Sequence, residues 1–226
     1  MREALRRITL PFALLAACAT PAAGAARPIP ATPAGAGAAA QAARAPQARR
    51  RPAAARRRGR RRLRRPDVIF VPTPPETVDE MLRQANLKKG DVLYDLGSGD
   101  GRIPLAAARR YGVRAVGIDI DPKLVAEANE AARREGLDQL VSFRLADMFA
   151  ADVREATVVT LYLSNTLNVM LRPKLLRELR PGARIVSHDF RMGDWPPERT
   201  VRVPWKNLYR TVYVWTVPRG GRYKKG

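Results

Sequence analysis

Between residues 92 and 217 the sequence alternates short apolar runs with segments of helical periodicity, which restricts the folds open to it. This alternation predicts an α/β fold with a mostly parallel sheet covered on both faces, because parallel strands need a crossover between them. The last two runs have no helix between them and predict a closing antiparallel hairpin. The seven predicted strands are 92–96, 115–120, 141–145, 157–163, 183–187, 200–203 and 209–217.

Prolines mark the starts of three of the four predicted helices. A proline suits the first turn of a helix, where its missing N–H would have no partner. Right-handed crossovers then bring the carboxyl ends of the parallel strands to one edge, where a ligand crevice is expected. The predicted helices are 74–85, 103–111, 122–135 and 173–179.

A glycine-rich loop, Gly97-Ser98-Gly99-Asp100-Gly101, lies between the first predicted strand and a helix. Glycines allow a tight turn and a close ligand approach, and the helix start offers free N–H groups. The spacing G-x-G-x-G differs from the dinucleotide pattern G-x-G-x-x-G, because position 102 is an arginine. The loop therefore indicates a nucleotide-like ligand and argues against an NAD-dependent oxidoreductase.

Carboxylates stand at the ends of the first three predicted strands. Asp119 follows Gly99 by 20 residues, where it can accept hydrogen bonds from two ribose hydroxyls. Asp147 follows 28 residues later, where it can accept from an adenine amino group, with Met148 or Phe149 against the ring. Asp95 can hold a positively charged amino group. Each acid alone could be a helix cap or a solvated loop residue, but together they favour a nucleoside site.

The runs 95–101, Gly117-Ile118-Asp119 and Ala146-Asp147 together resemble motifs I to III of the class I S-adenosylmethionine (SAM)-dependent methyltransferases. The resemblance covers about residues 67–217 and implies a Rossmann-like class I methyltransferase fold with SAM as its cofactor. The cofactor-binding residues that it implies are Thr73, Asp95, Gly97, Ser98, Gly99, Asp100, Gly101, Asp119, Ile120, Asp147 and Met148.

A narrower resemblance involves Val71-Pro72-Thr73-Pro74, the run 95–102 and the run 180–187. They are similar to the mitochondrial lysine methyltransferases that modify the ATP synthase c-subunit and the adenine nucleotide translocase. The non-SET histone lysine methyltransferases look like more distant relatives. The resemblance implies a protein lysine as methyl acceptor. A small-molecule methyltransferase and a non-catalytic SAM-binding module stay open as alternatives.

Three residues are predicted to act at the acceptor. Ser164 and Asn165 follow the fourth strand, which should end beside the glycine loop, and Asn165 is a candidate match to an asparagine of the histone enzymes. The run 163–166 nevertheless departs from that pattern, and also from the Asp/Asn-Pro-Pro-Tyr motif of nucleic-acid amino-methyltransferases. Asp189 and His188 could line an acceptor channel, although a sole histidine at a strand end is more often structural. Trp195 is a candidate channel wall or a packing residue.

The amino-terminal segment carries most of the chain's net charge of +21. Residues 1–66 hold 16 Lys/Arg and one acid. Residues 1–26 have a signal-peptide layout, with a possible lipobox ending at Cys18, or are simply an Ala-rich start. Residues 27–66, rich in Ala, Pro and Arg, are predicted to be a disordered linker before a methyltransferase domain at 67–226. This tail could contact an anionic membrane, nucleic acid or an acidic partner, or stay solvated.

The amino-terminal pattern and the cofactor point to different locations. A signal peptide predicts export or membrane anchoring, whereas a SAM-dependent enzyme is expected in the cytoplasm with its cofactor. A single cysteine excludes an intramolecular disulfide, and one cysteine with one histidine argues against a structural zinc site. No metal ligand is predicted.

Overall fold

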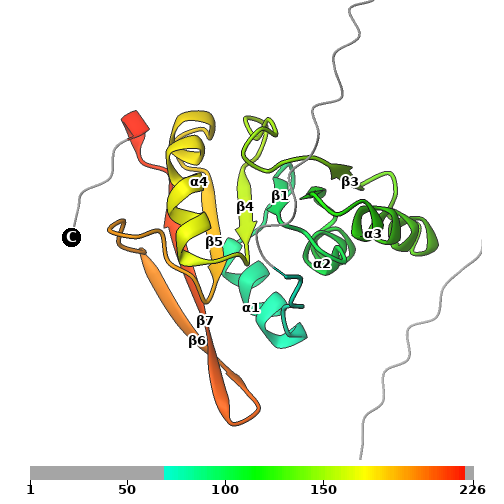
Figure 1. The fold of residues 1–226 in the computed structure, drawn as a ribbon, viewed down its shortest axis with the longest axis horizontal. Helices are drawn as coiled ribbons and strands as arrows, with labels where there is room; N and C mark the ends of the chain where they lie inside the picture. Colours follow the sequence, from blue (N-terminus) through cyan, green and yellow to red (C-terminus); the bar gives the residue numbers. More distant parts are fainter. Residues whose placement is uncertain (1–68, 222–226) are drawn as a thin grey trace, which may run out of the picture. The chain divides into compact units, whose positions relative to one another are not determined.

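The computed structural model describes residues 69–221, so the predictions for the segments 1–26 and 27–66 lie outside the described residues. A seven-stranded sheet with the order β3-β2-β1-β4-β5-β7-β6 forms the centre of the described part (Figure 1). The mostly parallel sheet and the closing antiparallel hairpin confirm the predicted fold class. The strands are β1 Val92–Leu96, β2 Arg114–Asp119, β3 Val141–Leu145, β4 Val158–Leu161, β5 Arg184–His188, β6 Arg199–Trp205 and β7 Leu208–Thr216.

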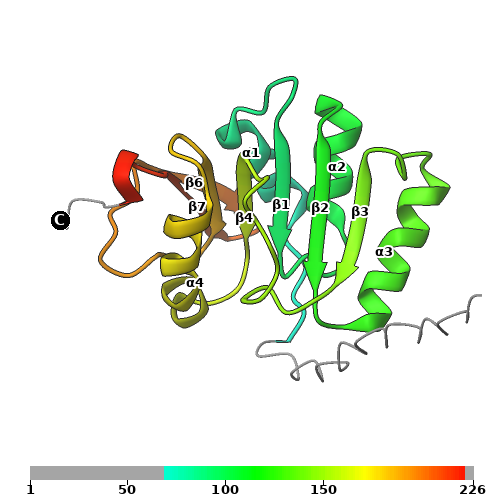
Figure 2. The same cartoon turned by 90° about the horizontal axis from the view of Figure 1, so that it is seen from above.

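Strands β1 to β5 run parallel to one another, so their carboxyl ends share one edge of the sheet. Figure 2 shows the arrows of β1, β2 and β3 pointing the same way. Strand β7 runs antiparallel to β5 and pairs with β6 along the whole of the hairpin. The amino-terminal end of β7 therefore lies at the same edge as the carboxyl end of β5.

Helices cover both faces of the sheet unequally. Apolar side chains of α1 (Pro75–Ala85), α2 (Arg102–Tyr111) and α3 (Pro122–Arg134) pack in one core. On the other face α4 (Asn165–Glu178) packs with the two buried tryptophans, Trp195 and Trp215. The strand β3 is joined to β4 by residues 146–157 without a helix. No helix within residues 69–221 has the length and apolar character needed to cross a membrane.

The start of α4 differs from the prediction. The predicted helix 173–179 was wrong at its beginning, because α4 starts at Asn165 and Pro173 lies inside it. An interior proline removes one helical hydrogen bond and usually costs about 3 kcal/mol. Here Leu167, Leu171 and Leu175, spaced by four residues and buried against the sheet, hold the helix across the proline.

Candidate cofactor and acceptor site

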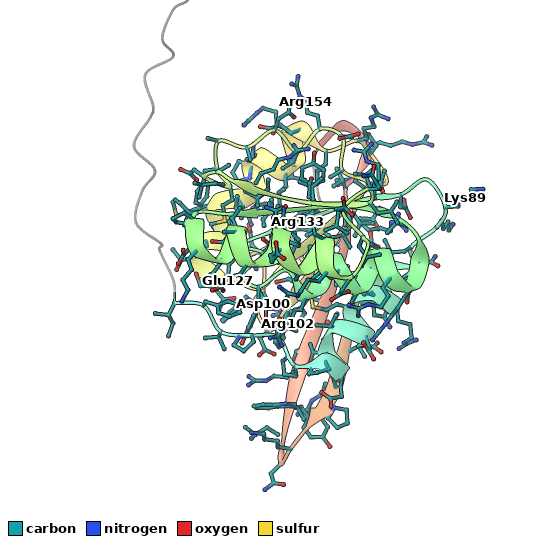
Figure 3. All side chains as sticks on the ribbon, turned by 90° about the vertical axis from the view of Figure 1, so that its right-hand side faces the viewer. Lys89, Asp100, Arg102, Glu127, Arg133 and Arg154 are labelled. Carbon is teal, nitrogen blue, oxygen red and sulfur yellow. The ribbon has the colours of Figure 1, made fainter. Side chains whose placement is uncertain are left out.

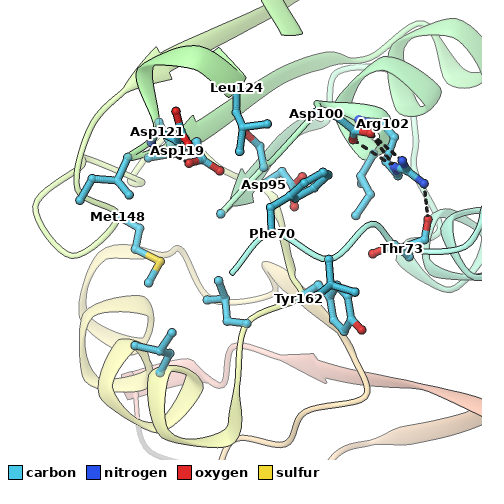
Figure 4. A pocket seen from close by; sticks show the side chains of 18 of the residues that line it. Phe70, Thr73, Asp95, Asp100, Arg102, Asp119, Asp121, Leu124, Met148 and Tyr162 are labelled. Carbon is cyan, nitrogen blue, oxygen red and sulfur yellow. Dashed lines mark hydrogen bonds and ion pairs between the residues drawn. The ribbon is translucent and has the colours of Figure 1, made fainter. Parts of the chain in front are cut away.

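A pocket of about 460 Å³ opens at the carboxyl edge of β1 to β4. Figure 4 shows its side chains converging from three places: the glycine loop, the ends of β2 to β4, and a segment before α1. We call residues 69–73 the strap. Its residues Ile69, Phe70, Val71 and Thr73 line the pocket, and the ring of Phe70 lies against the glycine loop. The crevice expected from the strand topology is thus present where the predicted ligand residues meet.

The glycine loop is folded tightly against the end of β2. The amides of Gly97 and Ser98 donate to the carbonyl of Ile118 at 2.8 and 3.1 Å. Gly99 has a φ of +54°, and a Cβ built on it would lie 2.2 Å from the ring of Phe70. Glycine is therefore required for both the turn and the close approach of the strap.

Asp119 holds the loop and faces the pocket. Its Oδ2 accepts from the amide of Gly99 at 2.8 Å and its Oδ1 from the amide of Asp121 at 2.9 Å. Each carboxylate oxygen has a second lone pair, so both oxygens can still accept from a ligand hydroxyl. This geometry suits the two neighbouring hydroxyls of a ribose.

Asp95 is the one deeply buried carboxylate of the pocket, at 3% exposure. Burial raises its pKa to about 7, although the hydroxyl of Thr160, which donates to it at 2.7 Å, lowers that pKa. The nearby carboxylates of Asp119 and Asp100 raise it further. A positively charged amino group in the pocket would relieve this cost. The residues present therefore fit SAM, which carries both an amino group and a ribose.

Arg102 fastens the strap to the glycine loop. Its guanidinium makes a two-pronged ion pair with Asp100, at 2.6 Å for the closest pair of atoms, and donates to the carbonyl oxygen of Thr73 at 2.8 Å. Figure 4 draws these bonds at the rim of the pocket. Arg102 therefore connects Asp100 of the glycine loop to Thr73 of the strap, and the position of the strap depends on this connection.

Behind the strap lies an aromatic stack at the ends of β4 and β5. The rings of Tyr162 and His188 lie 3.8 Å apart, and Phe190 follows at 5.8 Å from Tyr162. Burial lowers the pKa of His188 to about 4, against the raising effect of the Asp189 carboxylate. His188 is fully buried and neutral at physiological pH, and it does not line the pocket, so its role here is structural.

The structure brings most of the predicted cofactor residues together. Gly99 and Gly101 shape the loop without lining the pocket; Gly101 precedes α2 at a φ of +82°. The predicted residues that do line it are Thr73, Asp95, Gly97, Ser98, Asp100, Asp119, Ile120, Asp147 and Met148. These residues share one pocket, and their contacts with the cofactor stay predictions.

The three predicted catalytic residues lie outside the pocket lining. Ser164 caps α4 by accepting from the amide of Leu167 at 3.2 Å. The side-chain oxygen of Asn165 accepts from the amide of Arg191 at 2.8 Å. Asp189 accepts from the amide of Thr211 at 2.7 Å and pairs with Arg210. Each side chain thus holds a turn or helix end, and Trp195 is buried against Trp215 rather than forming a channel wall.

Several pocket residues could not be predicted from the sequence. Tyr162, Leu163 and Leu167 border the pocket from the end of β4 and the first turn of α4. Leu163 closely approaches Gly97, where an added Cβ would lie 2.6 Å from its Cδ2. The only sequence signal for Tyr162 was its position at the end of a strand. No sequence signal indicated that Phe70 contacts Gly99 or that Arg102 binds the strap, because these contacts join segments about 30 residues apart.

Comparison with known proteins agrees with the fit of the pocket to SAM. Residues 95–199 match the family model of the ANTKMT methyltransferase domain. A protein-lysine N-methyltransferase of Saccharolobus islandicus is 40% identical over 153 residues, covering 67% of this chain and 95% of the relative. The human lysine N-methyltransferase of the ATP synthase c-subunit is 32% identical over 136 residues, covering 60% of this chain and 58% of the relative.

A solved structure is also similar. The crystal structure of an RNA methyltransferase from Salinibacter ruber, in complex with S-adenosyl-L-homocysteine, is 54% identical. The similarity covers 66% of this chain and 95% of the Salinibacter chain, with a TM-score of 0.63.

The sheet order, the glycine loop and the strand-end carboxylates define a nucleoside-binding α/β site, as the motifs predicted. The chain belongs to the class I SAM-dependent methyltransferases, in the family that includes the lysine N-methyltransferases of the adenine nucleotide translocase and of the ATP synthase c-subunit.

Proposed function

We propose that this enzyme transfers the methyl group of SAM to the ε-amine of a lysine in a protein. The observation that carries the proposal is the 40% identity to an archaeal protein-lysine N-methyltransferase over 95% of that protein's length. The match of this chain to the family of the lysine methyltransferases named above also supports lysine as the acceptor.

The pocket offers an apolar approach for the amine. Bound SAM supplies a methyl group activated by a positively charged sulfur. Tyr162, Leu163 and Leu167 form the wall of the pocket beside the strap. An amine surrounded by these side chains is poorly hydrated, which lowers its pKa and favours the neutral, nucleophilic form. The wall also restricts the directions from which the nitrogen can approach, and such alignment is a large part of the rate enhancement in a transfer of this kind.

No side chain is assigned as a general base. The imidazole of His188 is buried away from the pocket lining. Burial raises the pKa of the Tyr162 phenol, so it stays protonated near neutral pH. The proton of the lysine ammonium is therefore lost to solvent before methyl transfer, and desolvation of the amine has the role that a base has in other enzymes.

RNA is the second candidate acceptor, because the Salinibacter structure at 54% identity is described as an RNA methyltransferase. Against RNA, the run Leu163-Ser164-Asn165-Thr166 lacks the Asp/Asn-Pro-Pro-Tyr motif of nucleic-acid amino-methyltransferases.

The two acceptors are separated by labelling. The full chain is incubated with methyl-labelled SAM and a cell lysate, and the protein, RNA and small-molecule fractions are counted separately. We expect label in protein, recovered as methylated lysine after acid hydrolysis, and much less label with Asp119→Ala at a limiting SAM concentration. Label confined to RNA or to small molecules would contradict the lysine proposal.

A further inference from the structure

The β6–β7 hairpin extends beyond the edge of the sheet that carries the pocket. The last pair between β5 and β7 is His188 with Val212, and β7 continues for four residues back to Leu208, paired only with β6 apart from local contacts at Asp189. At about 3.4 Å per residue the tip projects roughly 13 Å past the end of β5. Figure 1 shows the hairpin as an arm standing out from the domain.

The arm is basic and partly apolar. Its cations are Arg199, Arg202, Lys206 and Arg210, and the sequence contains no Asp or Glu from residue 199 to residue 226. Leu208 is 63% exposed at the tip, and Tyr209 beside it is 58% exposed. A surface of this kind fits a partner segment that combines carboxylates with apolar side chains.

Three of the four cations of the arm lie over its aromatic rings. The guanidinium of Arg202 lies 4.4 Å from the ring centre of Tyr209, and Lys206 and Arg210 lie 4.7 and 4.3 Å from that of Trp205. Within residues 69–221 Arg202 and Lys206 have no ion-pair partner, whereas Arg210 is paired with Asp189. A guanidinium stacked on a ring keeps its N–H edge free for a carboxylate.

Two features favour a peptide over a nucleic acid on this arm. Proteins that bind single-stranded nucleic acid present open aromatic faces for base stacking. Here the hairpin's own cations already lie over Trp205 and Tyr209. In addition, β6 is the outermost strand of the sheet, and the free backbone edge of such a strand can pair with an extended peptide.

We propose that the β6–β7 hairpin is a docking arm for an acidic segment of the protein substrate near its target lysine. This inference rests on the proposed lysine methyltransferase function. The arm selects lysines in acidic surroundings, because its positive charge repels segments rich in lysine and arginine.

A peptide library tests the arm directly. Each peptide has one central lysine, flanked by degenerate positions that contain Glu, Gln, Lys or Leu. The full chain methylates the library with saturating SAM, and the methylated pool is sequenced by mass spectrometry. We expect Glu to be enriched about tenfold over Gln in the flanks for the wild type. The charge-reversed variant R202E/K206E should lose this enrichment and prefer Lys in the flanks.

The matched control is K88E/K89E, which makes the same change of charge at the opposite edge of the sheet. These lysines are exposed and precede β1, and Figure 3 shows Lys89 on a loop far from the hairpin. The control should keep the wild-type preference, and all three proteins should bind SAM equally.

Three results would overturn the docking arm. A methylated library without Glu enrichment would contradict the docking arm but not the proposed function. A Glu enrichment that R202E/K206E retains would have the same meaning. Label found only in RNA, with no methylated lysine in the library or in lysate protein, removes the proposed function and the arm with it.

Discussion

The Oγ1 atom of Thr73 lies 3.2 Å from Nδ1 of His188, 115 residues later in the chain. Both side chains are buried, and this contact attaches the strap to the end of β5. The carbonyl of the same threonine accepts from Arg102. Thr73 is thus held from two sides, and the strap lies fixed over the glycine loop.

Thr73→Val should lower the free energy of unfolding by about 1–3 kcal/mol, because it leaves a buried ring nitrogen without its partner. SAM affinity should fall several-fold as the strap loosens. The measurements are urea denaturation and calorimetric titration. Thr77→Val is the control: the Thr77 hydroxyl is also buried but has no hydrogen-bond partner, so this change should be neutral or stabilising. Equal losses in both variants would contradict the role of the contact.

Asp119→Ala should weaken SAM binding by roughly 2–3 kcal/mol, because charge-assisted hydrogen bonds to a ribose and the anchor of Gly99 disappear together. Isothermal titration with SAM measures the loss, and circular dichroism checks that the variant is folded. Asp138→Ala, at an exposed carboxylate away from the pocket lining, should titrate like the wild type. A folded Asp119→Ala protein with wild-type affinity would reduce Asp119 to a local cap.

SAM binding should depend on pH through Asp95, whose pKa is raised to about 7 by burial. The cofactor's amino group favours the charged carboxylate, so binding releases a proton and affinity should rise between pH 6 and 8. The rise should approach tenfold per pH unit at the acid end. Titrations in buffers of different ionisation enthalpy measure the proton release. Asp95→Asn should bind SAM weakly and without this pH dependence.

Asp95→Asn, which should weaken SAM binding, should increase the stability of the protein without SAM. Because the native protein holds the Asp95 proton up to pH 7 and the unfolded chain releases it near pH 4, this group lowers stability as the pH rises through that window. Without SAM, Asp95→Asn should therefore be more stable than the wild type at pH 8, by at least about 1 kcal/mol. Chemical denaturation at pH 8 and pH 4.5 measures this. A larger gain at pH 4.5 would contradict the protonation of Asp95.

Tyr162→Ala should reduce kcat about tenfold or more while SAM affinity changes little, because we propose that this ring of the pocket lining guides the acceptor amine rather than the cofactor. Tyr162→Phe keeps the wall and the stacking on His188, so it should stay near the wild-type rate. Single-turnover kinetics with labelled SAM separate the methyl transfer from product release. A Phe variant as slow as the Ala variant would indicate that the hydroxyl itself takes part.

The strands and the cofactor side of the site could be predicted because their signals are local. Apolar runs fix the sheet, and the glycine loop with Asp95, Asp119 and Asp147 follows from strand ends that meet at one edge. These positions need only the chain order and the handedness of the crossovers.

The acceptor side could not be predicted in the same way. Pro173 suggested a helix start, which left Ser164 and Asn165 in an apparent loop and made them look available for catalysis. Once α4 begins at Asn165, the Ser164 hydroxyl is occupied as its cap. The stack of Tyr162 on His188 depends on how two strands lie together, and no pattern near either residue indicates it.

The order of the sheet also affects how the protein is completed during synthesis. Strand β1 is made first yet lies between β2 and β4, and the three strand-end carboxylates precede residue 148. His188, which anchors the strap, and the β6–β7 hairpin leave the ribosome afterwards. The nascent chain therefore contains its strand-end carboxylates before the residue that anchors the strap and before the hairpin, so the strap can be fastened only after β5 has been made.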